Sequence, residues 1–225
     1  AWMGTDVYAT IIAYRTDKYG ANGPKSWADF FNVEKFPGRR AMRKHPIDTI
    51  EEALLADGVP LDKLYPLDVD RAFKKLDAIK ADLVFWKSGA QPPQMLAAGD
   101  VVFTTAYNGR ITAANEKDKK NFKMVWKDTP YTMDSWVIMK GSSKKAEAEK
   151  LLEFMGRAEN GAKLPKYIRY GVTSGAATAL IDKSLMADLP TNPDNLKQAF
   201  PEDAKFWIDN GDKLAERWTK WSGTK

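Results

Sequence analysis

Three short stretches of the sequence bring aromatic and charged side chains close together. In the first, residues 104–110, Tyr107 is followed by Asn108 and Gly109. A ring beside a glycine, at the carboxyl end of a predicted strand, lets a small ligand approach the backbone closely. A helix capped by Asn108, with a half-buried Tyr107, accounts for the same residues. The sequence leaves both interpretations open.

The second stretch, residues 130–136, reads as a turn in which Asp134 lies among aromatic residues. A carboxylate beside apolar rings is costly unless it is paired, so such an acid often meets a cation. The alternative is that Asp134 caps the turn through its own backbone.

The third stretch, residues 44–48, precedes a predicted helix and contains His45 and Asp48. Spacing alone favours Asp48 as the residue that caps the helix. A ligand contact from both side chains is the alternative, because they bracket the first helical turn. An enzyme that uses them as an acid–base pair is the rival from another functional class.

Composition narrows the chemistry further. Cysteine is absent and His45 is the single histidine, so cysteine nucleophiles, cysteine-bound metals and two-histidine metal sites are excluded. The nucleotide-binding, lipase-type and zinc-protease signatures are missing. We therefore expect a non-enzymatic protein with no metal and no cofactor.

Charge and hydropathy exclude two more classes. The net charge is +5, but the two basic groups around Arg40 and Lys119 have acidic neighbours, so we expect no nucleic-acid partner. Apolar runs are only a few residues long, which excludes a membrane-spanning helix. Residues 1–4 show no signal-peptide pattern, although a signal peptide removed earlier would leave the same sequence.

The elements that must position these residues alternate between short strands and helices, which is typical of an α/β protein. Strands are expected at residues 6–14, 40–43, 84–86, 101–106, 122–126 and 136–139. Helices are expected at residues 27–31, 48–56, 70–82, 92–98, 108–120, 143–157 and 202–221.

Two of the helices carry an apolar stripe. In 143–157 the inward residues are expected to be Ala148, Leu151, Leu152 and Met155. In 202–221 the stripe consists of Trp207, Leu214, Trp218 and Trp221.

The order of several of these pieces resembles a known family. The stretches that carry the resemblance are 14–17, 26–30, 37–40, 94–101, 106–110, 133–136 and 170–173. Together they resemble the bacterial extracellular solute-binding proteins of ABC importers, in particular the spermidine/putrescine type. The resemblance implies a periplasmic protein that binds a small solute and hands it to an ABC permease in the inner membrane.

The fold implied by the resemblance is the type II periplasmic-binding-protein fold, with two α/β lobes that close on the ligand. Residues 1–11 would be the crossing strand of the first lobe, and 130–171 its returning part. Residues 12–129 and 172–225 would form a nearly complete second lobe. Because the N-terminal portion of the first lobe is absent, we expect apolar surface near residues 7–12 and 136–139, and self-association of the chain.

The resemblance also places residues in the ligand cleft. Tyr107, Asp134 and Tyr170 fall on cleft positions, and Asp48 matches an acidic position that binds an ammonium group. His45 stands where the polyamine pattern has a second acid, and Thr132 where it has a tryptophan.

These residues suit a small polyamine-like solute, because carboxylates pair with an ammonium group and rings hold a methylene chain. The alternative is an anionic or zwitterionic solute, such as an amino acid or a carboxylate. In that case the acid of a zwitterion would face Arg43 and its amine would face Asp134.

Overall fold

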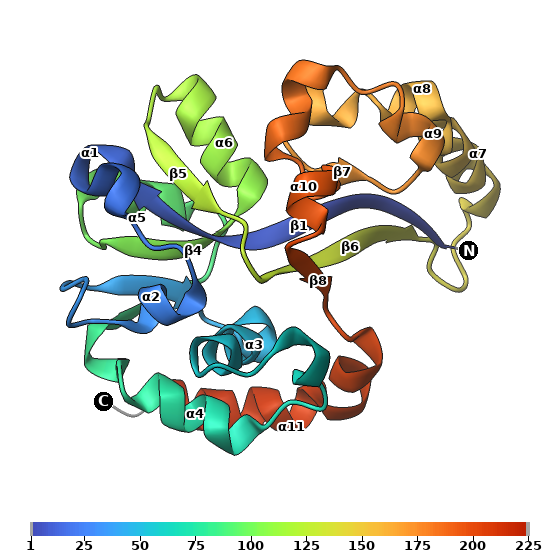
Figure 1. Ribbon diagram of the computed structural model, residues 1–225. Helices are drawn as coiled ribbons and strands as arrows, with labels where there is room; N and C mark the ends of the chain where they lie inside the picture. Colours follow the sequence, from blue (N-terminus) through green and yellow to red (C-terminus); the bar gives the residue numbers. More distant parts are fainter. Residues whose placement is uncertain (1, 224–225) are drawn as a thin grey trace.

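The long first strand is the centre of the molecule. The structure, a computed structural model, describes residues 2–223. Strand β1 (Trp2–Arg15) is rich in β-branched and aromatic residues and runs through both halves of the fold (Figure 1). Its first half pairs antiparallel with β6 (Thr129–Val137), and its second half pairs with β4 (Phe103–Tyr107) and β5 (Phe122–Val125).

Further strands extend the sheet on both sides of β1. Parallel strands β3 (Leu83–Trp86) and β2 (Arg40–Arg43) continue it beyond β4. On the other side, β8 (Ala199–Pro201) pairs with β6, and β7 (Gly171–Val172) pairs with β1. The alternation of strands and helices therefore produces the mixed α/β fold expected from the sequence.

Helices cover the part of the sheet formed by β2, β3 and β4. Helices α3 (Pro46–Ala56), α4 (Val69–Asp77) and α11 (Ala204–Gly223) lie together on one side (Figure 1), and their apolar faces share the largest core. Trp207, Leu214 and Trp218 are buried there, and Trp221 packs against the same core, so the predicted stripe is confirmed. The helices on this part of the chain are α1 (Thr16–Tyr19), α2 (Trp27–Phe31), α3 (Pro46–Ala56), α4 (Val69–Asp77), α5 (Gln91–Ala98), α6 (Asn108–Lys117) and α11 (Ala204–Gly223).

A smaller group of helices lies above the first half of β1. They are α7 (Lys145–Gly156), α8 (Ala158–Gly161), α9 (Gly175–Thr178) and α10 (Pro193–Leu196). Short 3-10 helices complete the chain: η1 (Gly20–Asn22), η2 (Leu61–Lys63), η3 (Lys80–Asp82), η4 (Leu164–Lys166) and η5 (Lys183–Asp188).

The small core of this second group joins residues on both sides of the expected lobe boundary at 171/172. Ala162 packs with Val172, Ala177 and Leu189 in one buried cluster. The division into lobes stays a prediction, and we propose to move this boundary to the region between α10 and β8.

Three predicted elements differ from the structure. Residues 130–136 are not a turn: residues 131–136 pair with β1, Pro130 pairs with Phe200 of β8, and strand β6 continues to Val137. The helix expected at 70–82 is divided into α4 and η3, and the helix expected at 108–120 ends at Lys117.

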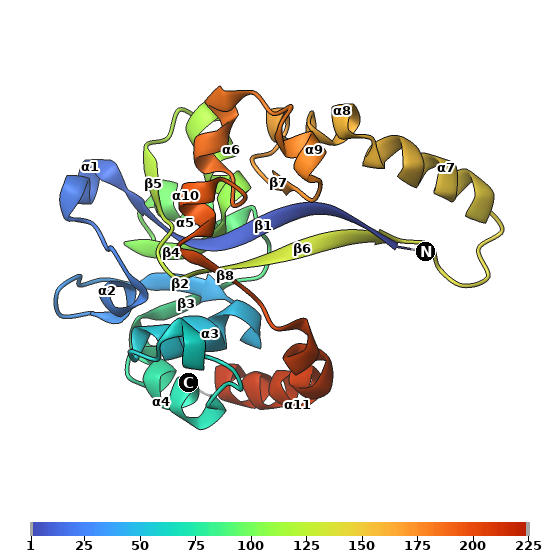
Figure 2. The ribbon, with the colours of Figure 1, turned by 45° about the vertical axis from the view of Figure 1, so that its right-hand side comes forward.

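The apolar face of α7 is also not buried as expected. The helix has no buried residue, and Leu151 is 56% exposed. Figure 2 shows α7 projecting beyond the end of the sheet, and the other three residues of the predicted stripe, Ala148, Leu152 and Met155, are only half-buried.

The predicted apolar surface is present at only one of its two places. Ala9–Ile12 are fully buried between strands, so the expectation for residues 7–12 is wrong. Trp136, Val137 and Met139 are 56%, 60% and 73% exposed, in agreement with the expectation for residues 136–139.

We expect this exposed face to cause self-association of the 225-residue chain. Trp136→Ser should lower the associated fraction, because contiguous apolar surface favours contacts between copies. Light scattering over a concentration series measures this, with Trp2→Ser as a second variant at an exposed tryptophan of the same end of the sheet. A wild-type chain that stays monomeric at high concentration contradicts the prediction.

Membrane insertion has no candidate element in the described part of the chain: none of its helices is long and apolar enough to cross a bilayer.

Candidate ligand-binding site

Three tyrosines meet around a cavity of about 270 Å³: Tyr8 from the middle of β1, Tyr107 from the end of β4 and Tyr170 from the residue before β7. The cavity is lined by Tyr8, Gly89, Tyr107, Arg110, Asp134 and Tyr170. The ring of Tyr8 contacts that of Tyr107 edge-on, with 5.1 Å between centroids, and its centroid lies 5.9 Å from that of Tyr170. These rings form a wall that suits a methylene chain or a cation.

Tyr107 is held at the end of β4 by its neighbours. Trp86 packs edge-on against it, with 5.3 Å between ring centroids. A Cβ atom on Gly89 would lie 2.9 Å from the Tyr107 ring, so only glycine fits there without a shift. The absence of a side chain at Gly89 therefore lets the ring reach the cavity.

Asn108 joins the elements around the cavity instead of capping α6. Its Oδ1 accepts a hydrogen bond from the backbone of Ala9 at 3.1 Å, and its Nδ2 donates to the carbonyls of Arg169 and Asp188. The capping prediction is therefore wrong: Tyr107 occupies the N-cap position, with no side-chain cap. Asn108 instead ties β1 to the segment that carries Tyr170.

Gly109 makes room for a tyrosine rather than directly for a ligand. A Cβ atom there would lie 2.7 Å from the ring of Tyr170 and 2.7 Å from Ile168. The first turn of α6 thus accepts Tyr170 closely, and this contact brings its ring to the cavity beside Tyr8.

Opposite charges line the cavity. Asp134 comes from β6 and Arg110 from the first turn of α6, and both side chains are solvent-accessible. A guanidinium group binds a carboxylate through two parallel hydrogen bonds, and a carboxylate binds an ammonium group. The cavity therefore offers one partner for each end of a zwitterion.

The tyrosine hydroxyls stay neutral at physiological pH. Burial raises the pKa of Tyr170 to about 12; Arg110 opposes this rise, and Asp6 adds to it. Burial is also the main cause of the raised pKa values of Tyr8 and Tyr107. Each hydroxyl can therefore both donate and accept a hydrogen bond.

Asp48, predicted as a ligand position, lies beneath this cavity and does not line it. Its carboxylate is 3% exposed and forms an ion pair with Arg43 at 3.1 Å. It does not cap the helix either: it has a positive φ of 69°, and the N-cap is His45. Such a backbone conformation is rare for a residue other than glycine.

Arg43 reaches the cavity only through Tyr107, since its guanidinium carbon lies 5.9 Å from that ring's centroid. The cationic side chain that lines the cavity is that of Arg110, for which no role was predicted from the sequence.

His45 and Thr132 also lie outside the lining. The His45 Nδ1 atom accepts a hydrogen bond from the backbone of Ile47 at 3.2 Å, and burial lowers the pKa of its ring. Thr132 is the cross-strand neighbour of Tyr8. Among the described residues, His45 and Asp48 share no hydrogen bond, so the acid–base pair is not assembled.

Buried acids surround Asp48. Glu51 and Glu52 are fully buried in α3, and Glu202 follows β8. Burial raises the pKa of Glu51 to about 7, and burial together with Asp48 raises that of Glu202 to about 11. These groups therefore hold protons at or near neutral pH, which limits the negative charge beneath the cavity.

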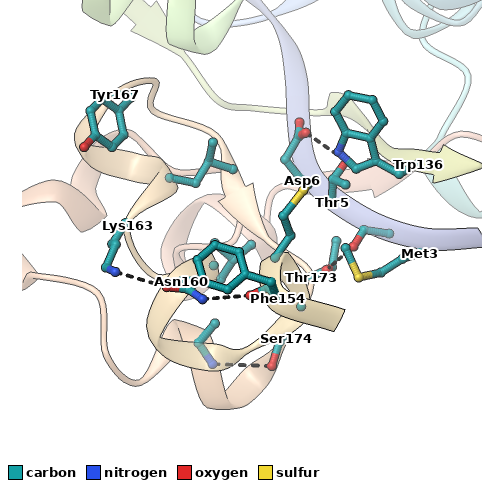
Figure 3. A pocket seen from close by; sticks show the side chains of 17 residues that line it. Met3, Thr5, Asp6, Trp136, Phe154, Asn160, Lys163, Tyr167, Thr173 and Ser174 are labelled. Atoms are coloured by element: carbon teal, nitrogen blue, oxygen red, sulfur yellow. Dashed lines mark hydrogen bonds between the residues drawn. The ribbon is translucent and has the colours of Figure 1, made fainter. Parts of the chain in front are cut away.

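A second, larger pocket of about 520 Å³ has Asp6 among its lining residues (Figure 3). Met3, Trp136, Phe154 and Tyr167 give it a largely apolar lining. Trp136, Phe154 and Tyr167 are more than half exposed, so this pocket belongs to the uncovered apolar face at the end of the sheet.

A family model described as bacterial extracellular solute-binding protein matches residues 1–193. The chain belongs to this family. The resemblance predicted from the sequence and the periplasmic-binding-protein fold are thereby confirmed.

The most informative relatives of this solute-binding protein bind other solutes than polyamines. It is 43% identical to the gamma-aminobutyric acid-binding protein of Pseudomonas aeruginosa, over 98% of this chain and 63% of that protein. The chain thus spans less than two thirds of the length of that curated relative. It is 36% identical to a solved GABA receptor, with a TM-score of 0.90, covering 100% of this chain and 69% of that one.

Two further solved structures are similar to this chain. MotA of A. tumefaciens B6, solved in complex with glucopine, is 32% identical with a TM-score of 0.91, covering 99% of this chain and 71% of that one. The spermidine/putrescine-binding PotD of Streptococcus pneumoniae is 14% identical with a TM-score of 0.73, covering 98% of this chain and 69% of that one, and this likeness shows the fold alone. The polyamine branch predicted from the sequence is therefore not supported beyond its fold.

Proposed function

We propose that this protein binds a zwitterionic ω-amino acid, of which 4-aminobutanoate is the reference compound, as the substrate-binding component of an ABC importer. The observation that carries the proposal is the placement of Arg110 and Asp134 on one cavity walled by tyrosines. The carboxylate of the ligand would bind Arg110, its ammonium group would bind Asp134, and its methylene chain would lie on the rings.

Two of the relatives support this ligand class. One is named a gamma-aminobutyric acid-binding protein and the other a GABA receptor, and this compound carries one ammonium and one carboxylate group. A polyamine has no carboxylate for Arg110 and would place a second ammonium group beside a guanidinium. We therefore replace the polyamine with a zwitterion as the preferred ligand.

Location and partner follow from the family. An extracellular solute-binding family implies a site outside the cytoplasmic membrane, and we propose the periplasm. The partner would be an ABC permease that receives the solute. Because the relatives are solute-binding proteins, we propose no enzymatic activity.

Calorimetric titration of the chain with 4-aminobutanoate, putrescine and glutarate tests the ligand class. We expect 4-aminobutanoate to bind most tightly, because only this compound matches both charges. Asp134→Asn should weaken its binding by about tenfold, since a charge-assisted hydrogen bond contributes about 1.5–3 kcal/mol and Asp134 is partly solvated.

Asp62→Asn, at an exposed aspartate outside the cavity lining, serves as the matched control. Tighter binding of putrescine than of 4-aminobutanoate would restore the polyamine interpretation. Binding of glutarate alone, unchanged in Asp134→Asn, would make the ligand an anion.

A further inference from the structure

Asp134 has a second carboxylate directly opposite it in the sheet. Asp6 of β1 and Asp134 of β6 are cross-strand partners. Directly opposite residues of an antiparallel pair point to the same face, with Cβ atoms about 4.5–5.5 Å apart. Tyr8, two residues further along β1, shares this face and lines the cavity. Asp6 itself lines the larger apolar pocket, so it lies between that pocket and the cavity that Tyr8 and Asp134 line.

Two like charges in this position cost folding free energy. Burial and the charge of Asp134 raise the pKa of Asp6. Its Oδ2 atom accepts a hydrogen bond from Thr5 at 3.2 Å, whereas its buried Oδ1 atom has no partner within the described residues. A sheet without a role for this pair would be better served by a neutral residue at one of the two positions.

The remaining groups around Asp6 do not neutralise it. On the side of β7 lie Tyr170 and Thr173, and the Thr173 hydroxyl donates to the Gly4 carbonyl at 2.9 Å. Lys163 lines the larger apolar pocket together with Asp6, but its ammonium group donates a hydrogen bond to Asn160 at 3.0 Å and not to Asp6 (Figure 3). Arg110 lies beside Tyr170 and lines the cavity together with Asp134.

We propose that Asp6 is a specificity-determining residue, which forms with Asp134 a two-carboxylate subsite for the amino group of the ligand. This inference rests on the proposed function. A single ammonium group beside the pair relieves the repulsion between the two carboxylates. A ligand with a carboxylate at this end meets two negative charges instead of one and is rejected.

Asp6→Asn tests this role in calorimetric titrations with 4-aminobutanoate. Affinity should fall about 3- to 10-fold at pH 7.5, because a charge near the ammonium group is lost in a partly solvated place. The ratio of wild-type to variant affinity should approach one as the pH falls below the pKa of Asp6, where the wild-type residue is also neutral. Asp62→Asn should show neither effect.

Melting temperatures measured without ligand test the repulsion between Asp6 and Asp134 independently of binding. Asp6→Asn and Asp134→Asn should each raise the melting temperature at neutral pH, and the double variant should gain less than the two increments combined, because both relieve the same repulsion. A wild-type chain that does not bind 4-aminobutanoate contradicts the proposed function. Additive melting shifts, or an Asp6→Asn affinity equal to wild type at every pH, overturn the inference about Asp6.

Discussion

Arg110→Ala should reduce the affinity for 4-aminobutanoate by about 10- to 100-fold, the largest loss that we expect from one side chain of the cavity. The loss removes the partner of the ligand carboxylate, and hydrogen bonds to charged groups contribute about 1.5–3 kcal/mol. Affinity for n-butylamine, which has no carboxylate, should change by less than about threefold or should rise, because the cation that repels it is removed. Isothermal titration calorimetry at low ionic strength measures both.

One further variant separates the charge of Arg110 from its geometry, and a second serves as a control. Arg110→Lys keeps the charge but loses the planar fork, so its affinity should lie between those of wild type and Arg110→Ala. Arg157→Ala removes an arginine that pairs with Glu153 on the surface of α7, and it should leave the affinity unchanged. Equal affinity of Arg110→Ala and wild type would show that the ligand carboxylate lies elsewhere.

Glu51→Gln should stabilise the chain at pH 8 and flatten the dependence of its stability on pH. The Oε1 atom of Glu51 accepts hydrogen bonds from Tyr65 and Trp207, both at 2.7 Å. An amide oxygen can accept both, whereas the ionised carboxylate is penalised by complete burial.

The direction of this pH dependence follows from the raised pKa of Glu51. Glu51 has a pKa of 4.5 when exposed and about 7 in the folded chain, so the folded state holds the proton more tightly. Its contribution to stability is complete below pH 4.5 and is lost as the pH rises to about 7. A shift of this size corresponds to about 3 kcal/mol, and an unpartnered amide N–H in the variant offsets part of it, which leaves a gain of about 1–2 kcal/mol at pH 8.

Urea denaturation of both forms between pH 5 and pH 8 measures the difference. Glu159→Gln, at an exposed glutamate of α8, is the matched control and should leave the profile unchanged. A Glu51→Gln variant that is less stable than wild type at pH 8 would mean that the charged form of Glu51 is favoured in the fold.

The regular elements were predictable where local pattern and burial agree. The stripe of Trp207, Leu214 and Trp218 repeats at helical spacing and lies in the core. Gly99 ends α5 in the left-handed conformation, as a glycine after an apolar helix predicts. The face of α7 has the same pattern yet is exposed, because periodicity records an apolar face and not the element that covers it.

The cavity could be predicted only in part. Tyr107, Asp134 and Tyr170 were placed by resemblance, and the structure brings these three together. Tyr8 was hidden in a strand that reads as buried, because alternation within a strand does not show which face meets a cavity. Arg110 follows Tyr107 by three residues, which places it in the first turn of α6, and this spacing was the available signal.

The assignments near His45 failed for a conformational reason. Spacing placed Asp48 at the cap of a helix, whereas the residue has a positive φ and its carboxylate pairs with Arg43 in the interior. The sequence carries no local sign of this conformation, since aspartate adopts it only rarely. Arg43, assigned to the ligand, is consequently occupied by Asp48.

A crystal structure of the chain with 4-aminobutanoate tests the central claim most directly, because it shows which group meets which charge. We predict a ligand between Tyr8, Tyr107 and Tyr170, with its carboxylate on Arg110 and its ammonium group on Asp134. A ligand in the opposite orientation, or one bound at Arg43 and Asp48, would contradict the account.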